Sequence, residues 1–383
     1  MTGRGYLMTP GPTPIPPAVA AAMAEPILYH RGPEFRDVLA RVLPRLSEVF
    51  RTRSPVALLT ASGTGAMESA VANLCSPGER VLVVSAGHFG ERWAQIARRY
   101  GCDVVELAYE WGEVPDAADV LARLAESGAG LVFCTYCDTS TGVVADVQGI
   151  ATRVKAGGAL CVVDAISALG ALPLETDEWG IDAVVSGSQK ALMTPPGLAF
   201  AAASDAALEK ARASTSPRYY LDWERALTAQ DELRNPFTPA VSLVRGLDAA
   251  LDLLLAEGLE AAWGRARRLG RACRAGVKAM GLELFSPDDD RSVVVTAIGV
   301  PDRVDGTAVV RRLRERSGIT IAGGQGPLRG KIVRIGHIGH VGLDDVVAAL
   351  EGLELVLTEL GVAVEPGVAA ASARDAYRQG VTV

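Results

Sequence analysis

A lysine that follows a largely apolar strand is the residue of this sequence with the clearest chemical potential. The strand is expected at residues 181–185. After the polar residues 186–189 the chain presents Lys190, and a second apolar run follows at 198–203. A lysine held between two buried strands is poorly hydrated, which disfavours its charged form. The neutral amine can attack a carbonyl carbon and form a Schiff base. The alternative is that Lys190 extends to solvent from a strand end, as most lysines do.

A run of hydroxyl and glycine residues at 62–65 is a candidate anion site. Ser62-Gly63-Thr64-Gly65 stands where an apolar strand gives way to a helical pattern. The N–H groups of a helix N-terminus attract anions, and the helix dipole alone contributes about 0.3–2 kcal/mol. A phosphate monoester suits such a site, although the same residues would also serve as a simple helix cap. The run lacks the lysine of a P-loop and the spacing of a dinucleotide-binding fingerprint.

Asp164 is a candidate partner for the lysine. It ends the apolar strand 160–163, so its carboxylate is expected to be buried, and a buried charge needs a partner or becomes neutral. An acid that keeps a pyridine nitrogen protonated and an amine that forms an imine are what pyridoxal phosphate requires. Alternatively, Asp164 caps a short helix that begins at residue 165.

Seven apolar segments are expected to form the sheet that positions these residues. Helical patterns lie between most of them, which predicts an α/β fold with a mainly parallel seven-stranded sheet covered by helices on both faces. Ligands of such sheets bind beyond the carboxyl ends of the strands. The polar residues at or just past those ends are Ser62, Thr64, Thr139, Asp164 and Lys190. The predicted strands are 56–60, 81–85, 104–107, 131–135, 159–164, 183–185 and 198–201.

The remaining chain is expected to form an arm and a second, smaller domain. Prolines make residues 1–17 an extended arm, and Pro44 is expected to kink or split a helix at 33–50. A large domain is predicted at 18–250 and a small α+β domain at 251–383. A long connecting helix at about 241–280, interrupted at Gly258, joins them. The small domain is expected to have strands at 292–298 and 331–336 and helices at 306–317 and 343–360, with the residues after Gly361 frayed.

Composition restricts the class of protein. The 383 residues are 49% apolar and carry a net charge of −7, which gives no basic face for nucleic acid. No apolar run approaches the roughly 18 residues of a membrane span, and prolines near the N-terminus argue against a signal peptide. Six cysteines in so long a chain suit a reducing cytoplasm. Cys134 and Cys137 have the spacing of a zinc pair, but their apolar surroundings favour the core, and His337 and His340 lack a carboxylate at metal-ligand spacing.

Several of these motifs occur together in one known family. Ser-Gly-Ser-Gln-Lys-Ala-Leu at 186–192 with Pro-Pro-Gly behind it, Val-Val-Asp-Ala-Ile-Ser at 162–167 and Ser-Thr-Gly at 140–142 resemble the class V, fold-type I aminotransferases. The most similar branch is the alanine/serine/aspartate–glyoxylate (or pyruvate) aminotransferase group. The resemblance extends from Pro10 to His337, and it implies pyridoxal 5′-phosphate as cofactor.

The resemblance also implies a role for each motif residue. Lys190 would be the Schiff-base lysine and then the base that moves the substrate's α-proton, while Asp164 would hold the pyridine nitrogen protonated. Phe89 would stack on the cofactor ring, where the family often has a larger ring, and it is otherwise helix core. The residues implied around the phosphate are Ser62, Gly63, Thr64 and Gln189; Thr139 would bond the ring oxygen or atoms near it, and Ile166 would cover the opposite ring face.

Two further contacts are implied for the partner subunit and the substrate. In the family a partner loop completes the phosphate site, and Thr238 matches it, so a homodimer is expected; Asn235 departs from the tyrosine of some relatives. Arg334 would bind the substrate α-carboxylate, with a structural salt bridge as the alternative. Gly11 and residues 29–31 are expected to reach the same cleft.

Three functions remain open from the sequence. The first is transamination in two half-reactions, from serine, alanine or aspartate to glyoxylate, pyruvate or a similar small 2-oxo acid, through the pyridoxamine form of the cofactor. The second is a lyase on the same fold, of the desulfurase or aldolase type. The loop 321–330 holds no cysteine, which counts against a desulfurase. The third is a colourless nucleotide-binding or scaffold protein.

Overall fold

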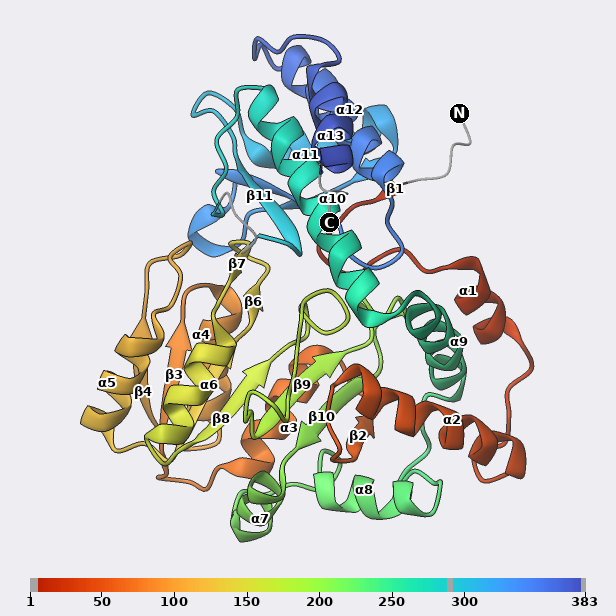
Figure 1. The fold of residues 1–383 in the computed structure, drawn as a ribbon, viewed down its shortest axis with the longest axis vertical. Coiled ribbons are helices and arrows are strands. Elements are labelled where there is room, and N and C mark those ends of the chain that lie inside the picture. Colours follow the sequence, from red (N-terminus) through yellow and green to blue (C-terminus); the bar gives the residue numbers. More distant parts are fainter. Residues whose placement is uncertain (1–5, 288–291, 380–383) are drawn as a thin grey trace.

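A seven-stranded sheet forms the centre of the computed structural model, which describes residues 6–287 and 292–379 (Figure 1). Its strand order is β2-β10-β9-β8-β5-β3-β4. The strands from β9 to β4 pair in parallel, whereas β10 runs antiparallel to both neighbours. The predicted seven-stranded, mainly parallel sheet is confirmed. The bounds are β2 Val56–Leu59, β3 Arg80–Ser85, β4 Asp103–Ala108, β5 Leu131–Thr135, β8 Leu160–Asp164, β9 Ala183–Gly187 and β10 Ala199–Ala203.

Alternate residues of each central strand enter the apolar clusters on opposite faces of the sheet. In β9, Val184 belongs to one cluster while Ala183 and Val185 belong to the other. Because side chains alternate along a strand, a continuous apolar run is what a sheet covered on both faces requires. One face is covered by α2 (Pro33–Val49), α5 (Ala117–Ser127) and α6 (Val147–Ala156), and the other by α3 (Gly63–Leu74), α4 (His88–Arg99), α7 (Asp205–Ala213) and α8 (Trp223–Asp231). Cys134 and Cys137 are buried in the first cluster, as predicted.

Helix α2 continues through Pro44, so the prediction of a split helix is wrong. Pro44 lies on the exposed face of α2. The carbonyl that loses its N–H partner to a proline can there bind water, so the break in hydrogen bonding is tolerated.

The chain from α10 (Leu259–Ala279) onward forms a smaller layer above the main sheet (Figure 1). Helices α9 (Val241–Glu257) and α10 meet at Gly258, whose φ of 88° ends the first helix as predicted. A three-stranded antiparallel sheet has the order β11-β14-β13, and it packs with α11 (Gly306–Ser317) and α12 (Leu343–Glu359). The bounds are β11 Val295–Gly299, β13 Ala322–Gly323 and β14 Ile332–Gly336; the two-residue β13 was not predicted.

Residues 368–379 form a helix, so the prediction of a frayed end is wrong for them; residues 380–383 lie outside the described residues. Helix α13 (Val368–Gln379) packs against α10 and α12. Its buried residues are Ala369 and Ala373, which allow a close approach. A Cβ added at Gly276 of α10 would lie 2.9 Å from the carbonyl oxygen of Ala369. This helix is held by small residues rather than by a stripe of large apolar ones.

The N-terminal arm links the smaller layer to the main sheet. Strand β1 (Tyr6–Leu7) pairs in parallel with β12 (Ile319–Thr320). The arm then runs without regular structure as far as α1 (Pro17–Ala24), which packs on α9. On the way the backbone N–H of Thr13 donates to the carbonyl of Gln189 at 3.1 Å. Between β1 and α1 the arm contains neither a helix nor a strand.

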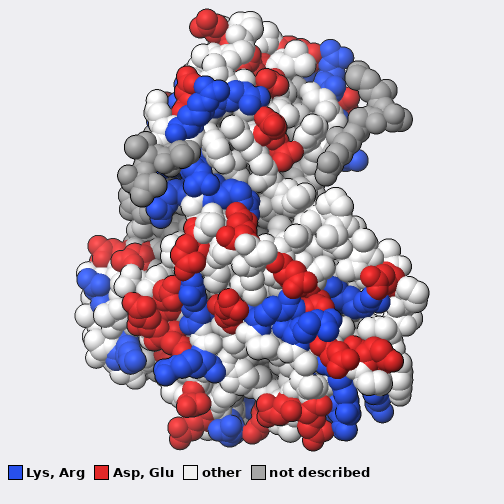
Figure 2. Space-filling model, turned by 45° about the vertical axis from the view of Figure 1, so that its right-hand side comes forward, with Lys and Arg blue, Asp and Glu red and all other residues white. Residues whose placement is uncertain are grey.

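The surface carries charges of both signs. On the face shown in Figure 2, Lys and Arg alternate with Asp and Glu over most of the molecule. Within the described part of the chain, none of the helices combines the length and apolar character needed to cross a bilayer.

Candidate active site

Eight of the predicted site residues line one cavity of about 290 Å³ at the carboxyl ends of the central strands. They come from the N-terminal arm, the start of α3, the start of α4, the end of β8 and the turn after β9. The edge of the sheet therefore gathers them as the parallel topology predicts. The eight are Gly11, Gly63, Thr64, Phe89, Asp164, Ile166, Gln189 and Lys190.

Lys190 is buried, with 8% of its surface exposed. Its Nζ donates to the carbonyl of Pro10 at 2.7 Å, and the Thr13 hydroxyl donates to the Lys190 carbonyl at 2.7 Å. Burial lowers the pKa of Lys190 to about 8, partly opposed by nearby Cys137 and Asp164. The expectation of a poorly hydrated lysine is confirmed, and its alternative, an extension to solvent, is wrong.

Gly11 is the residue that lets the arm pass over this lysine. A Cβ added at Gly11 would lie 2.5 Å from Cδ, Cε and Nζ of Lys190, and its φ is +144°. Both the close approach and the backbone conformation therefore require glycine.

Asp164 ends β8 with only 3% of its surface exposed. Burial raises the pKa of Asp164 to about 7, and the N–H of Ile166, which donates to the carboxylate at 2.8 Å, acts in the opposite direction. This contact is the cap that the sequence left as an alternative, so the carboxylate caps the turn while it also lines the cavity. An ionised Asp164 gains from any cation that is bound beside it.

The start of α3 fits an anion. Ser62 caps the helix by accepting from the N–H of Gly65 at 3.4 Å. Gly63 packs so closely that an added Cβ would lie 2.8 Å from Ile166 Cδ1. Gln189 Oε1 is buried without a hydrogen-bond partner among the described residues. A helix N-terminus and a cradle without Cβ atoms together fit the phosphate of pyridoxal phosphate.

The structure also reveals a carboxylate that the sequence interpretation missed. Asp138 is buried and accepts from the N–H groups of Phe89 at 2.9 Å and Gly90 at 3.3 Å. It also accepts from the hydroxyl of Ser140 at 2.6 Å, and that hydroxyl accepts from the N–H of His88 at 3.0 Å. Asp138 thus caps α4 and fixes the ring of Phe89 beside the cavity.

Arg334 lies on β14 and is buried, with 5% of its surface exposed. Its guanidinium donates to the carbonyls of Gly323 and Thr139. No carboxylate of residues 6–287 or 292–379 forms an ion pair with it, so the structural salt bridge is not observed there. Burial lowers the pKa of Arg334 to about 10. Thr139 therefore meets the site through its carbonyl, which anchors this arginine.

Two of the predicted contacts, Thr238 and the stretch 29–31, lie away from this cavity. Thr238 is exposed and lines a separate small pocket with Asn235 and Tyr220. Tyr29 is 66% exposed in the loop between α1 and α2, and residues 29–31 do not line the cavity of their own chain. Ser62 and Thr139 stand next to the cavity wall through the contacts given above.

Arg92 is a second residue that the sequence interpretation missed. It stands one helical turn after Phe89 on α4 and lines the cavity with Lys190. The helical spacing from Phe89 was the available signal, because residues three apart share a helix face.

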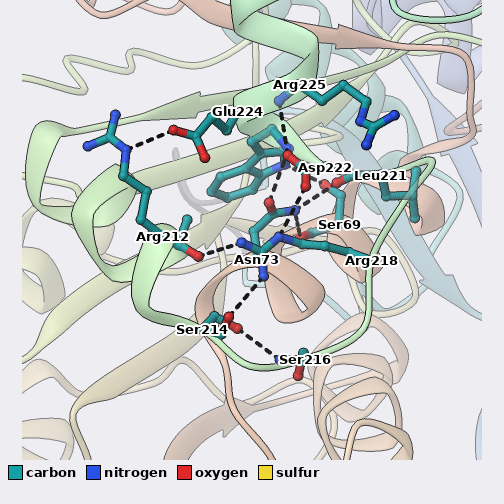
Figure 3. Close-up of polar contacts among 12 residues, drawn as sticks. Ser69, Asn73, Arg212, Ser214, Ser216, Arg218, Leu221, Asp222, Glu224 and Arg225 are labelled. Carbon is teal, nitrogen blue, oxygen red and sulfur yellow. Dashed lines mark hydrogen bonds and ion pairs between the residues drawn. The ribbon is translucent and has the colours of Figure 1, made fainter.

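A buried polar network holds α3 against α8 (Figure 3). Asn73 donates to the carbonyls of Ser69 and Leu221, both at 2.7 Å, and accepts from the N–H of Trp223 at 3.0 Å. The indole N–H of Trp223 donates to the Ser69 hydroxyl at 2.9 Å. The helix whose first turn forms the anion site is therefore fixed along its length.

Comparisons with known proteins agree with this geometry. The family model described as Aminotransferase class-V matches residues 5–334. A Synechococcus protein named soluble hydrogenase, small subunit, is 40% identical over 97% of this chain and 98% of its own length. L-aspartate–glyoxylate aminotransferase of Paracoccus denitrificans is 35% identical over 99% of this chain and 98% of its own. The solved ureidoglycine–glyoxylate aminotransferase of Bacillus subtilis superposes with a TM-score of 0.94 at 32% identity and covers 99% of both chains.

Proposed function

The chain belongs to the class V aminotransferases, which use pyridoxal phosphate, and on that premise we propose that it transfers an amino group from a small amino acid to a small 2-oxo acid. The observation that carries the proposal is Lys190, a buried lysine of lowered pKa in the same cavity as the buried carboxylate of Asp164. A nucleotide-binding scaffold needs neither residue there.

Each residue of the cavity takes one part of the chemistry. When bound, pyridoxal phosphate supplies an aldehyde carbon for an amine and a ring that accepts the electron pair of a broken C–H bond. Lys190 would hold the cofactor covalently through Nζ, and its free amine would move the α-proton of the donor. A pKa of about 8 leaves part of its amine neutral near pH 7. Asp164 keeps its charge against the protonated pyridine nitrogen.

The other residues of the site would bind and orient the cofactor and the substrate. Ser62, Gly63, Thr64 and Gln189 hold the phosphate, while Phe89 and Ile166 enclose the ring and exclude water. Thr139 positions Arg334, whose guanidinium binds the α-carboxylate of donor and acceptor. Two parallel hydrogen bonds from one guanidinium fix that carboxylate, which lysine would not reproduce. Gly11 leaves room above Lys190.

We infer glyoxylate or pyruvate as acceptor and serine, alanine or aspartate as donor. The support is the aspartate–glyoxylate and ureidoglycine–glyoxylate activities in the names of the relatives. A lyase of the desulfurase kind is not favoured, because the loop 321–330 holds no cysteine nucleophile. The hydrogenase name of the Synechococcus relative has no counterpart here, since among residues 6–287 and 292–379 no three His, Cys, Asp or Glu side chains are grouped as metal ligands.

The working unit that we propose is a cytoplasmic homodimer in which Thr238 of each chain binds the phosphate held by the other. Thr238 is exposed and separate from its own chain's cavity, which supports this role. We further infer two domains, residues 18–250 and 251–383. A separate apolar cluster in the second half of the chain supports the division.

The test is a matrix of amino donors against glyoxylate, pyruvate and 2-oxoglutarate, read by oxo-acid formation. We expect yellow protein that bleaches with donors and turns over with at least one pair. Lys190→Ala is expected to be colourless and inactive, whereas Lys331→Ala, at an exposed lysine, keeps both properties. A wild-type protein whose cofactor absorbance never responds to any donor refutes transamination.

A further inference from the structure

The cavity that holds Lys190 is lined by a second guanidinium. Arg92 is half-buried, and its Cζ lies 4.7 Å from the centroid of the Phe89 ring. Nη1 donates to the hydroxyl of Thr64 at 3.0 Å, and Nη2 lies 2.9 Å from His88 Nε2. Burial lowers the pKa of His88, which keeps its ring neutral and able to accept. Every direct neighbour of this cation is therefore uncharged.

Arg92 forms no direct ion pair in the described part of the chain. Burial lowers the pKa of Arg92, and Asp164 and Asp138 act in the opposite direction from beyond ion-pair distance. None of the ion pairs among residues 6–287 and 292–379 includes Arg92, although arginines on the surface of the same helix, such as Arg98, are paired. A guanidinium has five N–H donors, and the two contacts above use two of them. A partly desolvated cation with three free donors beside a cavity is suited to an oxyanion ligand, because such charge-assisted bonds are the strong ones.

The other arginine of the site, Arg334, has different hydrogen-bond partners. Arg334 is fixed by the carbonyls of Gly323 and Thr139 and is proposed above to bind the α-carboxylate. Arg92 instead contacts Thr64 in the first turn of α3, between the anion site and His88. A second anionic group would thus meet a second guanidinium.

We propose that Arg92 is a further anion-binding residue of this active site, which takes either the phosphate of the cofactor or the side-chain carboxylate of a dicarboxylic donor. The proposal rests on the proposed function. The contact with Thr64 is the argument for the phosphate. The argument for the carboxylate is that Arg92 lines the substrate cavity without a direct ion pair among residues 6–287 and 292–379, with Asp164 and Asp138 beyond ion-pair distance.

The experiment compares Arg92→Gln, Arg92→Lys and the control Arg99→Gln, which changes an exposed arginine on the same helix. In one arm, cofactor-free protein is titrated with pyridoxal phosphate and with pyridoxal. In the other arm, the holoenzyme is assayed with aspartate and with alanine as donors. The loss of one hydrogen bond to a charged group lowers the affinity about ten- to a hundred-fold.

If Arg92 binds the phosphate, Arg92→Gln lowers the affinity for pyridoxal phosphate about ten- to a hundred-fold and leaves the affinity for pyridoxal almost unchanged. If it binds the donor carboxylate, kcat/KM falls by that factor for aspartate and not for alanine. Arg92→Lys, which keeps the charge, recovers part of either loss, and Arg99→Gln matches wild type. Should Arg92→Gln fail to fold, the same ratios are read from Arg92→Lys against Arg99→Gln, with a loss of a few-fold expected.

Equal losses for both members of each pair, or no loss, would mean that Arg92 merely packs on Phe89 and would overturn the proposal. Failure of the proposed function looks different, because wild-type protein would then transaminate no donor at all. A protein that transaminates normally and is indifferent to Arg92→Gln in both arms rejects only the anion-binding role.

Discussion

At the scale of single residues, burial moves two pKa values towards each other. It lowers the pKa of Lys190 to about 8 and raises the pKa of Asp164 to about 7. Both groups are therefore close to titration near neutral pH, where proton transfer by a general base is most efficient. In water the same two groups would be fully charged at this pH.

The buried lysine should make the cofactor-free protein less stable below pH 8. There the folded state holds a poorly hydrated ammonium that the unfolded chain keeps in water. A shift from the ordinary 10.5 to about 8 corresponds to a penalty of about 3 kcal/mol, reduced by about 1 kcal/mol for the bond to Pro10. We expect Lys190→Met to raise the free energy of unfolding by about 2 kcal/mol at pH 6.5.

The stability gained by Lys190→Met should disappear as the pH rises. Lys190 loses its proton from pH 8 upward in the folded state, and near pH 10.5 in the unfolded state. Urea unfolding of wild type and Lys190→Met at pH 6.5 and at about pH 10 measures the difference. Lys331→Met, at an exposed lysine, should change neither value. A gain that is constant across this range would contradict a lowered pKa for Lys190.

Asp164→Asn keeps a side chain that can accept from the N–H of Ile166 but removes the charge. A buried charge pair that loses one partner costs about 3–5 kcal/mol, so we expect the rate of the first half-reaction to fall at least a hundred-fold. Single-turnover absorbance after addition of a donor measures that rate. Because the carboxylate also raises the pKa of Lys190, the variant's lysine should titrate below about 8. An unchanged rate would exclude a role for this charge.

At the scale of helices and strands, what the sequence predicts depends on the kind of packing. The strands were recognisable because each is buried on both faces and so reads as an uninterrupted apolar run, as in Leu131–Thr135. Helix α13 was missed because its contacts are made by alanines, Ala369 and Ala373, which give no apolar period. The split at Pro44 was wrongly expected because exposure of that residue depends on how α2 packs.

Some residues of the candidate site could also be predicted from the sequence, and others could not. Residues at strand ends, such as Asp164 and Lys190, could be predicted because the carboxyl ends of parallel strands share one edge. Asp138 and Arg92 act across the chain, on the first turn of α4 and on Thr64. Helical spacing could have placed Arg92 on the face of Phe89, but its contact with Thr64 and those of Asp138 depend on how separate segments meet in space, which spacing along the chain does not encode.

Loss of the polar network between α3 and α8 should disturb the anion site at the start of α3. Asn73→Ala leaves the carbonyl of Leu221 and the N–H of Trp223 without their buried partner, which costs about 2–4 kcal/mol (Figure 3). We expect a lower free energy of unfolding and weaker pyridoxal phosphate binding, since the first turn of α3 is proposed to hold the phosphate. Urea unfolding and cofactor titration measure the two effects. The exposed Gln95→Ala is the control, and normal stability in Asn73→Ala would contradict the network's role.

At the scale of the whole molecule, the site depends on segments far apart in the chain. The arm pairs with β12, and its Met8 carbonyl accepts from the N–H of Gly336 before Pro10 reaches Lys190. Gly336 has no room for a Cβ, which would lie 2.4 Å from the carbonyl oxygen of Thr9. The arm therefore fixes the lysine to the smaller sheet that carries Arg334.

An aromatic patch beside Thr238 is where a second copy of the chain would dock. Tyr220 stacks on Phe237 with ring centroids 5.0 Å apart, and Arg225 lies over the ring of Tyr219. Tyr219 and Tyr220 expose 65% and 45% of their surface. Aromatic residues and arginine are the types enriched at protein interfaces, so this patch fits an interface that brings Thr238 to a neighbouring phosphate.

Thr238→Ala should therefore weaken the binding of pyridoxal phosphate without dissociating the proposed dimer, because it would remove one hydrogen bond to a charged group and little contact area. The expected loss is about ten- to a hundred-fold in affinity. Tyr220→Glu, which places a charge in the patch, should instead shift sedimentation towards the monomer and weaken the cofactor most at low protein concentration. Thr228→Ala, at an exposed threonine of α8, should change neither property. A wild-type monomer that binds the cofactor at full occupancy and tightly would show that each chain completes its own phosphate site.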